Sequence, residues 1–245
     1  MKNLMRGTIY QLKRDNFFFG CLALSFILLM ISIRSFSPGL ETIPVMGVSS
    51  LMETFLGGDF ILYAFMLLTA NMVAEAYRSG AMKTIMGRGV AKKKYYLSIV
   101  FTVSAAYLLV MLISSIVMGV LAYSRSGLGA VLYPGYYALS IAARVLFVMA
   151  YISFAVTMTI LTQNAITGVI FALVIPNIPQ IVEMALHFLK LNVELDFLKI
   201  STYMPSVSAA SNDLSSFLLC FVVLGGYLMV SFAAGFGLLK YQDIK

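Results

Sequence analysis

The chain has 245 residues, of which 61% are apolar and 11% are charged, with 17 basic and 10 acidic side chains. Soluble domains average about 45–50% apolar and about 25% charged residues, so this composition excludes a soluble globular enzyme and a disordered basic tail. Two cysteines and one histidine supply too few ligands for a disulfide framework or a His/Cys zinc site.

Long uncharged runs predict the membrane-spanning segments. A bilayer core about 30 Å thick needs about 20 apolar helical residues, and continuous apolar runs exclude the alternating pattern of a barrel strand. The run between Arg144 and Glu183 is too long for one crossing and divides at the polar triplet 162–164. The sequence therefore predicts an all-α membrane protein with a single transmembrane domain, 1–245, and six spans. Four of them are at 17–33, 55–74, 95–124 and 214–239, and the other two lie on either side of the polar triplet.

The charges between the spans predict the orientation. On the side that holds both termini there are twelve basic and three acidic residues, and on the other side there are five basic and seven acidic residues. Because basic residues collect in cytoplasmic loops, we expect both termini to be cytoplasmic. The net charge of +7 therefore reflects topology rather than nucleic-acid binding. Too few apolar residues precede Cys21 for a signal peptide, so we expect the first span to be uncleaved.

Two cytoplasmic segments have amphipathic patterns. In residues 1–16, Met1, Met5, Ile9 and Leu12 recur at helical spacing, with basic residues on the other side. This pattern predicts a helix that lies in the headgroup layer, and the alternative is an ordinary basic flank.

The loop between the second and third spans carries the second pattern. An apolar stripe at helical spacing lies between Gly80 and Gly87 and consists of Ala81, Met82, Ile85 and Met86. We expect a short helix that docks a soluble partner, and the alternative is a solvated loop whose apolar residues touch the bilayer.

This loop resembles the first cytoplasmic loop of type-2 ABC transporter permeases. An acidic residue, a glycine, a short apolar stripe and basic residues follow in the family's order, although Gly87-Arg88-Gly89 lacks the family's proline. The resemblance implies a coupling helix that docks a separate ATPase subunit, a second permease copy (homodimer or paralogous heterodimer) and a bacterial cytoplasmic membrane. The docking residues that it implies are Glu75, Gly80, Ala81, Met82, Ile85, Met86 and Arg88.

The segment after the fifth predicted span is also unusual. Pro176 and Pro179 break the helix before it would leave the bilayer, and an apolar stretch with Glu183 and His187 follows. Irregular backbone at this depth is tolerated only where protein or a water cavity covers it. The resemblance implies external re-entrant helices before the last span, and the alternative is a kinked span followed by a plain loop.

Two charged residues fall inside predicted spans near their outer ends. Asp59 and Arg144 form a pair at that depth in one interpretation, and in the other, which we favour, each side chain reaches the outer surface. There is no G-x-x-x-x-G-K-[ST] motif and no H-E-x-x-H motif, so we expect no nucleotide site, cofactor or catalytic residue in this chain.

Together with these features, the resemblance implies the membrane-spanning permease subunit of an ATP-driven exporter. The 16 methionines and 18 phenylalanines suit an adaptable apolar surface, which favours amphipathic peptides or hydrophobic drugs as substrates. Modulin-type toxins and bacteriocins are the peptides that small exporters of this class handle. The alternatives are a stand-alone membrane immunity or binding protein, and the membrane component of an importer.

Overall fold

The computed structural model describes residues 2–35, 59–126, 134–188 and 214–241. Every regular element within these residues is helical, as the continuous apolar runs predicted. In chain order the elements are α1 (Lys2–Arg14), α2 (Asn16–Ser35), α4 (Asp59–Arg78), α5 (Ala81–Gly87), α6 (Lys92–Ser126), α7 (Pro134–Thr162), α8 (Ala165–Val174), the 3₁₀ turn η1 (Ile175–Asn177), α9 (Ile178–Phe188) and α11 (Leu214–Tyr241).

Five helical stretches in the described residues are long and apolar enough to cross a membrane. They match the second to sixth predicted spans and comprise Phe60–Arg78, Lys92–Leu121, Ala138–Thr162, Ala165–Phe188 and Phe217–Lys240. The first predicted span forms α2, which has 20 residues and contributes the shorter apolar stretch Asn16–Ile27. A helical membrane architecture is thus confirmed, whereas the sixth crossing stays a prediction.

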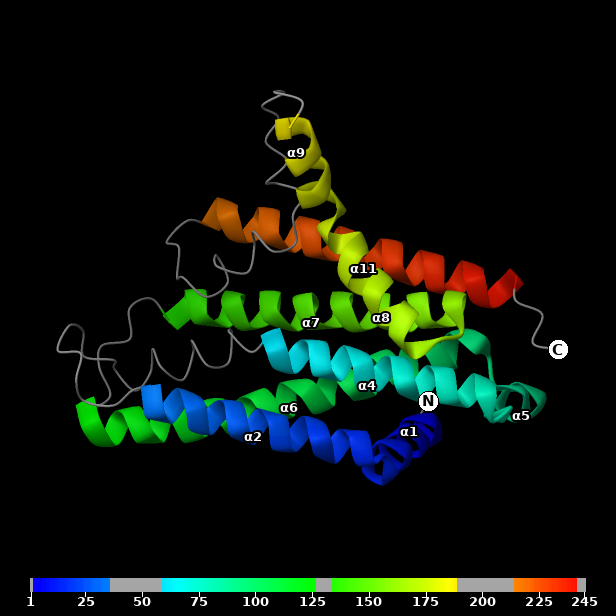
Figure 1. Cartoon of the computed structure of the whole chain (residues 1–245), viewed down its shortest axis with the longest axis horizontal. Coiled ribbons are helices and arrows are strands. Elements are labelled where there is room, and N and C mark those ends of the chain that lie inside the picture. The colour runs from blue at the N-terminus through cyan, green and yellow to red at the C-terminus, as the bar shows by residue number, and fades with distance from the viewer. Residues whose placement is uncertain (1, 36–58, 127–133, 189–213, 242–245) are drawn as a thin grey trace.

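Helix α7 lies at the centre of the bundle. It packs against α4, α6, α8 and α11, and Figure 1 shows it between α11 on one side and α4 and α6 on the other. Of the five membrane-length stretches, the one in α7 is the most buried, and those in α8–α9 and α11 are the least buried. The last two helical segments therefore leave most of their apolar surface uncovered by this chain.

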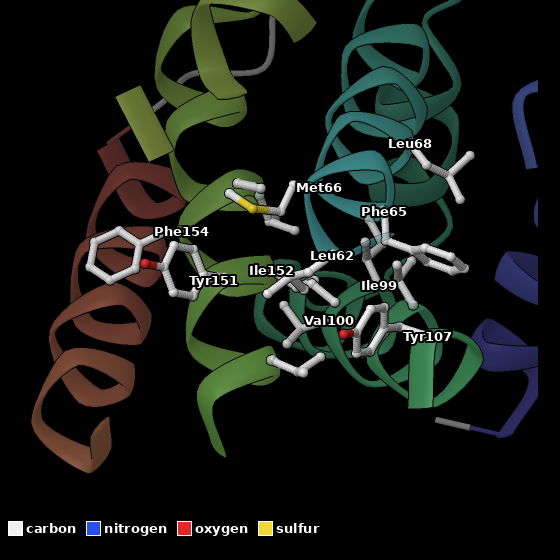
Figure 2. Close-up of a cluster of buried hydrophobic side chains, with 14 of the residues drawn as sticks. Leu62, Phe65, Met66, Leu68, Ile99, Val100, Tyr107, Tyr151, Ile152 and Phe154 are labelled. Carbon is white, nitrogen blue, oxygen red and sulfur yellow. The ribbon is translucent and has the colours of Figure 1, made fainter. Parts of the chain in front are cut away.

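The core forms where α4, α6 and α7 meet. Figure 2 shows Leu62 and Phe65 of α4 near Val100 and Tyr107 of α6 and Ile152 of α7. The rings of Phe65 and Tyr107 meet edge to face with their centroids 5.6 Å apart. Inside a bilayer, helices associate through such close packing rather than through a hydrophobic driving force.

Helix α1 and the end of α11 lie at the same end of the bundle, together with α5 and the turn between α7 and α8 (Figure 1). The basic residues of α1, of the α4–α6 connection and of the last turn of α11 therefore share one end, which we call the basic end. This arrangement fits the charge count, and the cytoplasmic location of the basic end stays a prediction.

The predicted N-terminal helix is present as α1, but it packs differently from the expected face. It contacts α6, and it buries Leu12 and Thr8 while Ile9 remains 41% exposed. The Asp15 carboxylate accepts a 2.8 Å hydrogen bond from the backbone N–H of Phe17, which caps the start of α2. Helix α1 is therefore held against the bundle, rather than resting on lipid alone.

The predicted turn at 162–164 is confirmed as a tight helical hairpin. Helix α7 ends at Thr162, Gln163 takes a left-handed φ of 52°, and the Asn164 side chain accepts a 3.0 Å hydrogen bond from Ile166 N. Gly168 then lies so close to α7 that a Cβ atom there would be 2.8 Å from the Cα of Thr159. A glycine is needed at this contact because any side chain would separate the helices.

The predicted break at the prolines is confirmed. Helix α8 has 10 residues, about 15 Å of length, and η1 with the buried Pro176 joins it to α9. Helix α9 has no buried residue, and Figure 1 shows it extending beyond α11, away from the other helices. Because α8 alone is half a bilayer core in length, the break leaves both alternatives open, and re-entry stays a prediction.

Candidate functional site

The short helix α5 lies at the basic end, between the long helices α4 and α6. Gly80 precedes it with φ 70°, and Gly89 follows it with φ 77°. Both values lie in the left-handed region, which a residue with a Cβ atom adopts only at a cost. Gly87, predicted as the second bracketing residue, is instead the last residue of the helix. The bracketing glycines are therefore Gly80 and Gly89.

The apolar stripe of α5 faces the chain's own bundle. Met82 is 1% exposed and belongs to the core, and Ile85 and Met86 pack against that core. Lys83 and Arg88 are exposed. The prediction that the stripe itself enters a partner's groove is therefore wrong for Met82, because its side chain is already enclosed. The exposed face of α5 is therefore basic rather than apolar.

Glu75 lies in the last turn of α4, which ends at Arg78. Its backbone carbonyl accepts hydrogen bonds from the backbone N–H of Ser79 at 2.8 Å and from the Ser79 hydroxyl at 2.7 Å. The Glu75 side chain is exposed. This residue thus contributes its backbone to the turn before Gly80 and leaves its carboxylate at the surface, beside the connection that leads to α5.

The start of α6 is tied to the end of α11 at the same end of the bundle. The Lys92 ammonium donates a 2.7 Å hydrogen bond to the backbone carbonyl of Leu239. Lys93 lies with its Nζ atom 5.4 Å from the centre of the Phe236 ring, a cation–π distance. A positive charge near the carbonyl end of a helix is favourable, so Lys92 stabilises the last turn of α11.

A buried polar network joins α6, α7 and α11 further along the bundle. The Tyr96 hydroxyl lies 2.9 Å from the Thr157 hydroxyl and donates to the Ser153 carbonyl at 3.1 Å. Thr157 also donates to the carbonyl of Ser231 at 3.2 Å. Gly235 allows this contact, because a Cβ there would be 2.6 Å from the Tyr96 ring. Hydrogen bonds of this kind fix the register of helices within a membrane.

Sequence reasoning missed this network. The signal that points to it is the pair Ser153 and Thr157, which are four residues apart and therefore share one face of a helix. Their partners on the other helices are set only by how α6, α7 and α11 pack, and a single sequence does not provide that information.

Arg144 is the buried charge of the described core. Its side chain is 1% exposed, and Nη2 donates a 2.6 Å hydrogen bond to the Tyr107 hydroxyl on α6. The guanidinium carbon also lies 5.2 Å from the centre of the Phe147 ring. The favoured interpretation, in which Arg144 reaches the outer surface, is therefore wrong. The Asp59 side chain lies outside the described residues, so the predicted pair stays a prediction.

The residues predicted for the external region lie along η1 and α9. Pro176 is buried in η1 and Pro179 falls in the first turn of α9, where its missing N–H is tolerated. Glu183 is half-buried and His187 is exposed. Each of them lies on this segment.

Cysteines and metal ligands give no second site in the described part of the chain. Cys21 and Cys220 are both buried free thiols, and the Cys21 thiol donates to the carbonyl of Ala64 at 3.6 Å. No three His, Cys, Asp or Glu side chains gather closely enough among these residues to hold a metal ion.

No family model, curated protein or solved structure matches the chain. The functional interpretation therefore depends on the geometry described above. The features that bear on function are therefore the basic connection with α5, the lysine contacts between α6 and α11, the network around Thr157 and the buried Arg144.

Proposed function

We propose that the chain is the membrane-spanning permease subunit of an ATP-driven ABC exporter. In this proposal ATP is hydrolysed on a separate subunit, and two permease copies form the transport unit. The observation that carries the proposal is α5, a short helix that lies between two membrane-length helices at the basic end of the bundle and buries Met82 in the core.

The packing of α5 supports a role in transmitting movement from a bound ATPase subunit to the spans. Met82 anchors it in the core, while Lys83 and Arg88 face outward. A force applied to the outer face of α5 therefore reaches α4 through the core, and it reaches α6 through the short connection after Gly89. A solvated loop without a buried anchor would transmit no such displacement.

The uncovered apolar faces support a second copy. The stretches in α8–α9 and in α11 are the least buried of the five membrane-length stretches. Exposed apolar side chains on them include Val222, Met229 and Phe188. A second permease packed on this side would cover part of that surface, as the resemblance to the exporter family implies.

The substrate class rests on the same surfaces. Exposed methionine and phenylalanine side chains adapt to ligands of varied shape, and amphipathic peptides carry the matching apolar faces. We therefore propose amphipathic peptides or hydrophobic drugs as the exported substrates, leaving the cell across the cytoplasmic membrane.

The test measures ATP hydrolysis by the tagged chain purified from its own membranes. The wild-type preparation is expected to hydrolyse ATP through the co-purified subunit. Lys83→Glu and Arg88→Glu reverse the exposed charges at α5. The two new carboxylates would repel an acidic surface on the ATPase subunit, so this activity should be abolished. Met82→Asp is a poorer variant, because a carboxylate there would disrupt the chain's own core.

The matched control reverses two exposed charges at the same end of the bundle. Lys13→Glu and Arg14→Glu on α1 should leave ATP hydrolysis unchanged. A wild-type preparation without any ATP hydrolysis would favour the stand-alone immunity or binding protein. ATP-driven uptake of a fluorescent amphipathic peptide into inside-out vesicles would support export, and its absence with active ATPase would favour the importer.

A further inference from the structure

A hollow of about 460 Å³ lies between the start of α6 and the end of α11, at the basic end of the bundle. This volume falls within the range of about 300–1,000 Å³ that small-molecule sites occupy. The residues that line it are Ala91, Lys92, Lys93, Phe236, Gly237, Leu239 and Lys240.

The charged side chains that line this hollow are all positive. Lys92, Lys93 and Lys240 line it, and no acidic side chain is among its described lining residues. Two of these lysines open α6, where the helix dipole is itself positive and cations are unfavourable. The Leu239 carbonyl holds Lys92 in place and the Phe236 ring holds Lys93. The three lysines therefore create a positive potential in the hollow, and this potential favours the binding of an anion.

The rest of the wall is apolar. Phe236 presents a half-buried ring, and Gly237 leaves open space because nothing lies within 4 Å of where its Cβ would be. A small soluble anion would make no contact with this apolar surface. A phospholipid carries both parts, a phosphate for the lysines and acyl chains for the aromatic wall. Basic hollows between membrane helices are the recognised form of such headgroup sites.

We propose that this hollow binds the headgroup of an anionic phospholipid from the leaflet that faces the basic end. The phosphate lies among Lys92, Lys93 and Lys240, and the first part of an acyl chain lies along Phe236. The bound lipid joins α6 to α11 in addition to the direct contact between Lys92 and the Leu239 carbonyl. This site does not depend on the proposed transport function.

The absence of tryptophan from the sequence provides the probe. Phe236→Trp places a single fluorophore in the wall of the hollow and preserves an aromatic ring for Lys93. The full chain is reconstituted in phosphatidylcholine vesicles that contain either brominated phosphatidylglycerol or brominated phosphatidylcholine. Bromine quenches tryptophan on contact, so the ratio of quenching gives the local preference for the anionic lipid.

A second reporter measures diffuse attraction to the basic end. Phe19→Trp lies in the first turns of α2, is 57% exposed, and follows the basic residues Lys13 and Arg14. Each lysine near a membrane surface raises the affinity for an anionic lipid about fivefold. The two lysines that the variants below remove, Lys93 and Lys240, therefore predict a preference of roughly 25-fold at the Phe236→Trp reporter, and we expect a clearly smaller one at Phe19→Trp.

Three variants decide the outcome. Lys93→Gln with Lys240→Gln should reduce the preference at the Phe236→Trp reporter to that at Phe19→Trp, and Lys93→Arg should retain it. The matched pair Lys13→Gln with Lys83→Gln removes two exposed charges away from the hollow and should leave the preference unchanged.

Several results would overturn the proposal. Equal quenching by the two lipids at the Phe236→Trp reporter would show that the hollow does not select anions. Equal loss in the matched pair would show that only the overall charge matters. Relief of quenching by millimolar inorganic phosphate would identify a free phosphate site rather than a lipid site, whereas persistent quenching in phosphate supports the lipid.

Discussion

Gly168 allows α8 to approach α7 closely enough for their backbones to touch. A Cβ atom at this position would lie 2.8 Å from the Cα and 2.9 Å from the nitrogen of Thr159. These are backbone atoms of α7, which packs against α4, α6, α8 and α11. Gly168→Ala therefore forces α8 away from α7 rather than displacing a flexible side chain.

The size of the effect follows from two opposing terms. Overpacking a tight contact costs about 1–3 kcal/mol. Replacing a helical glycine by alanine returns about 0.5–1 kcal/mol of conformational free energy. The net destabilisation is thus between zero and about 2.5 kcal/mol, which lowers the melting temperature by up to roughly 10 °C for a chain of this size.

The same substitution in α11 serves as the control. Gly226 lies on an exposed face with nothing within 4 Å of its Cβ position, so Gly226→Ala should raise the melting temperature by a few degrees. Thermal unfolding of both variants in detergent, followed by size-exclusion chromatography, measures the two shifts. If Gly168→Ala also raised the melting temperature, the close contact between α7 and α8 would be refuted.

Three further predictions rest on buried groups and on the basic end. Tyr107→Phe removes a hydrogen bond to a charged group and should cost about 1.5–3 kcal/mol, whereas Tyr96→Phe should cost about 0.5–1.5 kcal/mol; melting temperatures in detergent compare the two. Cys21 and Cys220 should react with maleimide only after denaturation, and mass spectrometry that found them disulfide-linked would contradict the fold. A cysteine introduced by Lys93→Cys, in a chain without the native cysteines, should resist impermeant labels added outside the cell, and rapid labelling would reverse the predicted orientation.

The helical framework could be predicted from local signals in the sequence. The apolar runs gave the membrane-length helices because their length matches a bilayer. The polar triplet ending at Asn164 gave the hairpin because its side chain accepts a hydrogen bond from the start of α8. Pro176 gave the break because it lacks the donor that a helix interior requires.

The burial of single residues could not be predicted in the same way. Arg144 was expected to reach the outer surface, but α7 begins at Pro134, so Arg144 lies about 15 Å from the start of the helix, where it donates a hydrogen bond to Tyr107 of α6. Met82 was expected to insert into a groove on a partner, but it is buried in the chain's own core. The amphipathic pattern of a short helix does not show which apolar surface its apolar side chains contact. Both facts depend on packing between distant segments, which leaves no periodic trace in the sequence.

The length of α6 has a consequence for the membrane around the protein. Its uncharged part, residues 95–124, extends about 45 Å, and even a tilt of about 40° leaves it spanning roughly 34 Å along the bilayer normal. An average hydrocarbon core is about 30 Å thick, and a helix that exceeds it thickens the adjacent bilayer at a cost of fractions of a kcal/mol per Å. The chain is therefore expected to partition into thicker membrane regions, and short-chain lipids should strain α6 before they strain the shorter α4.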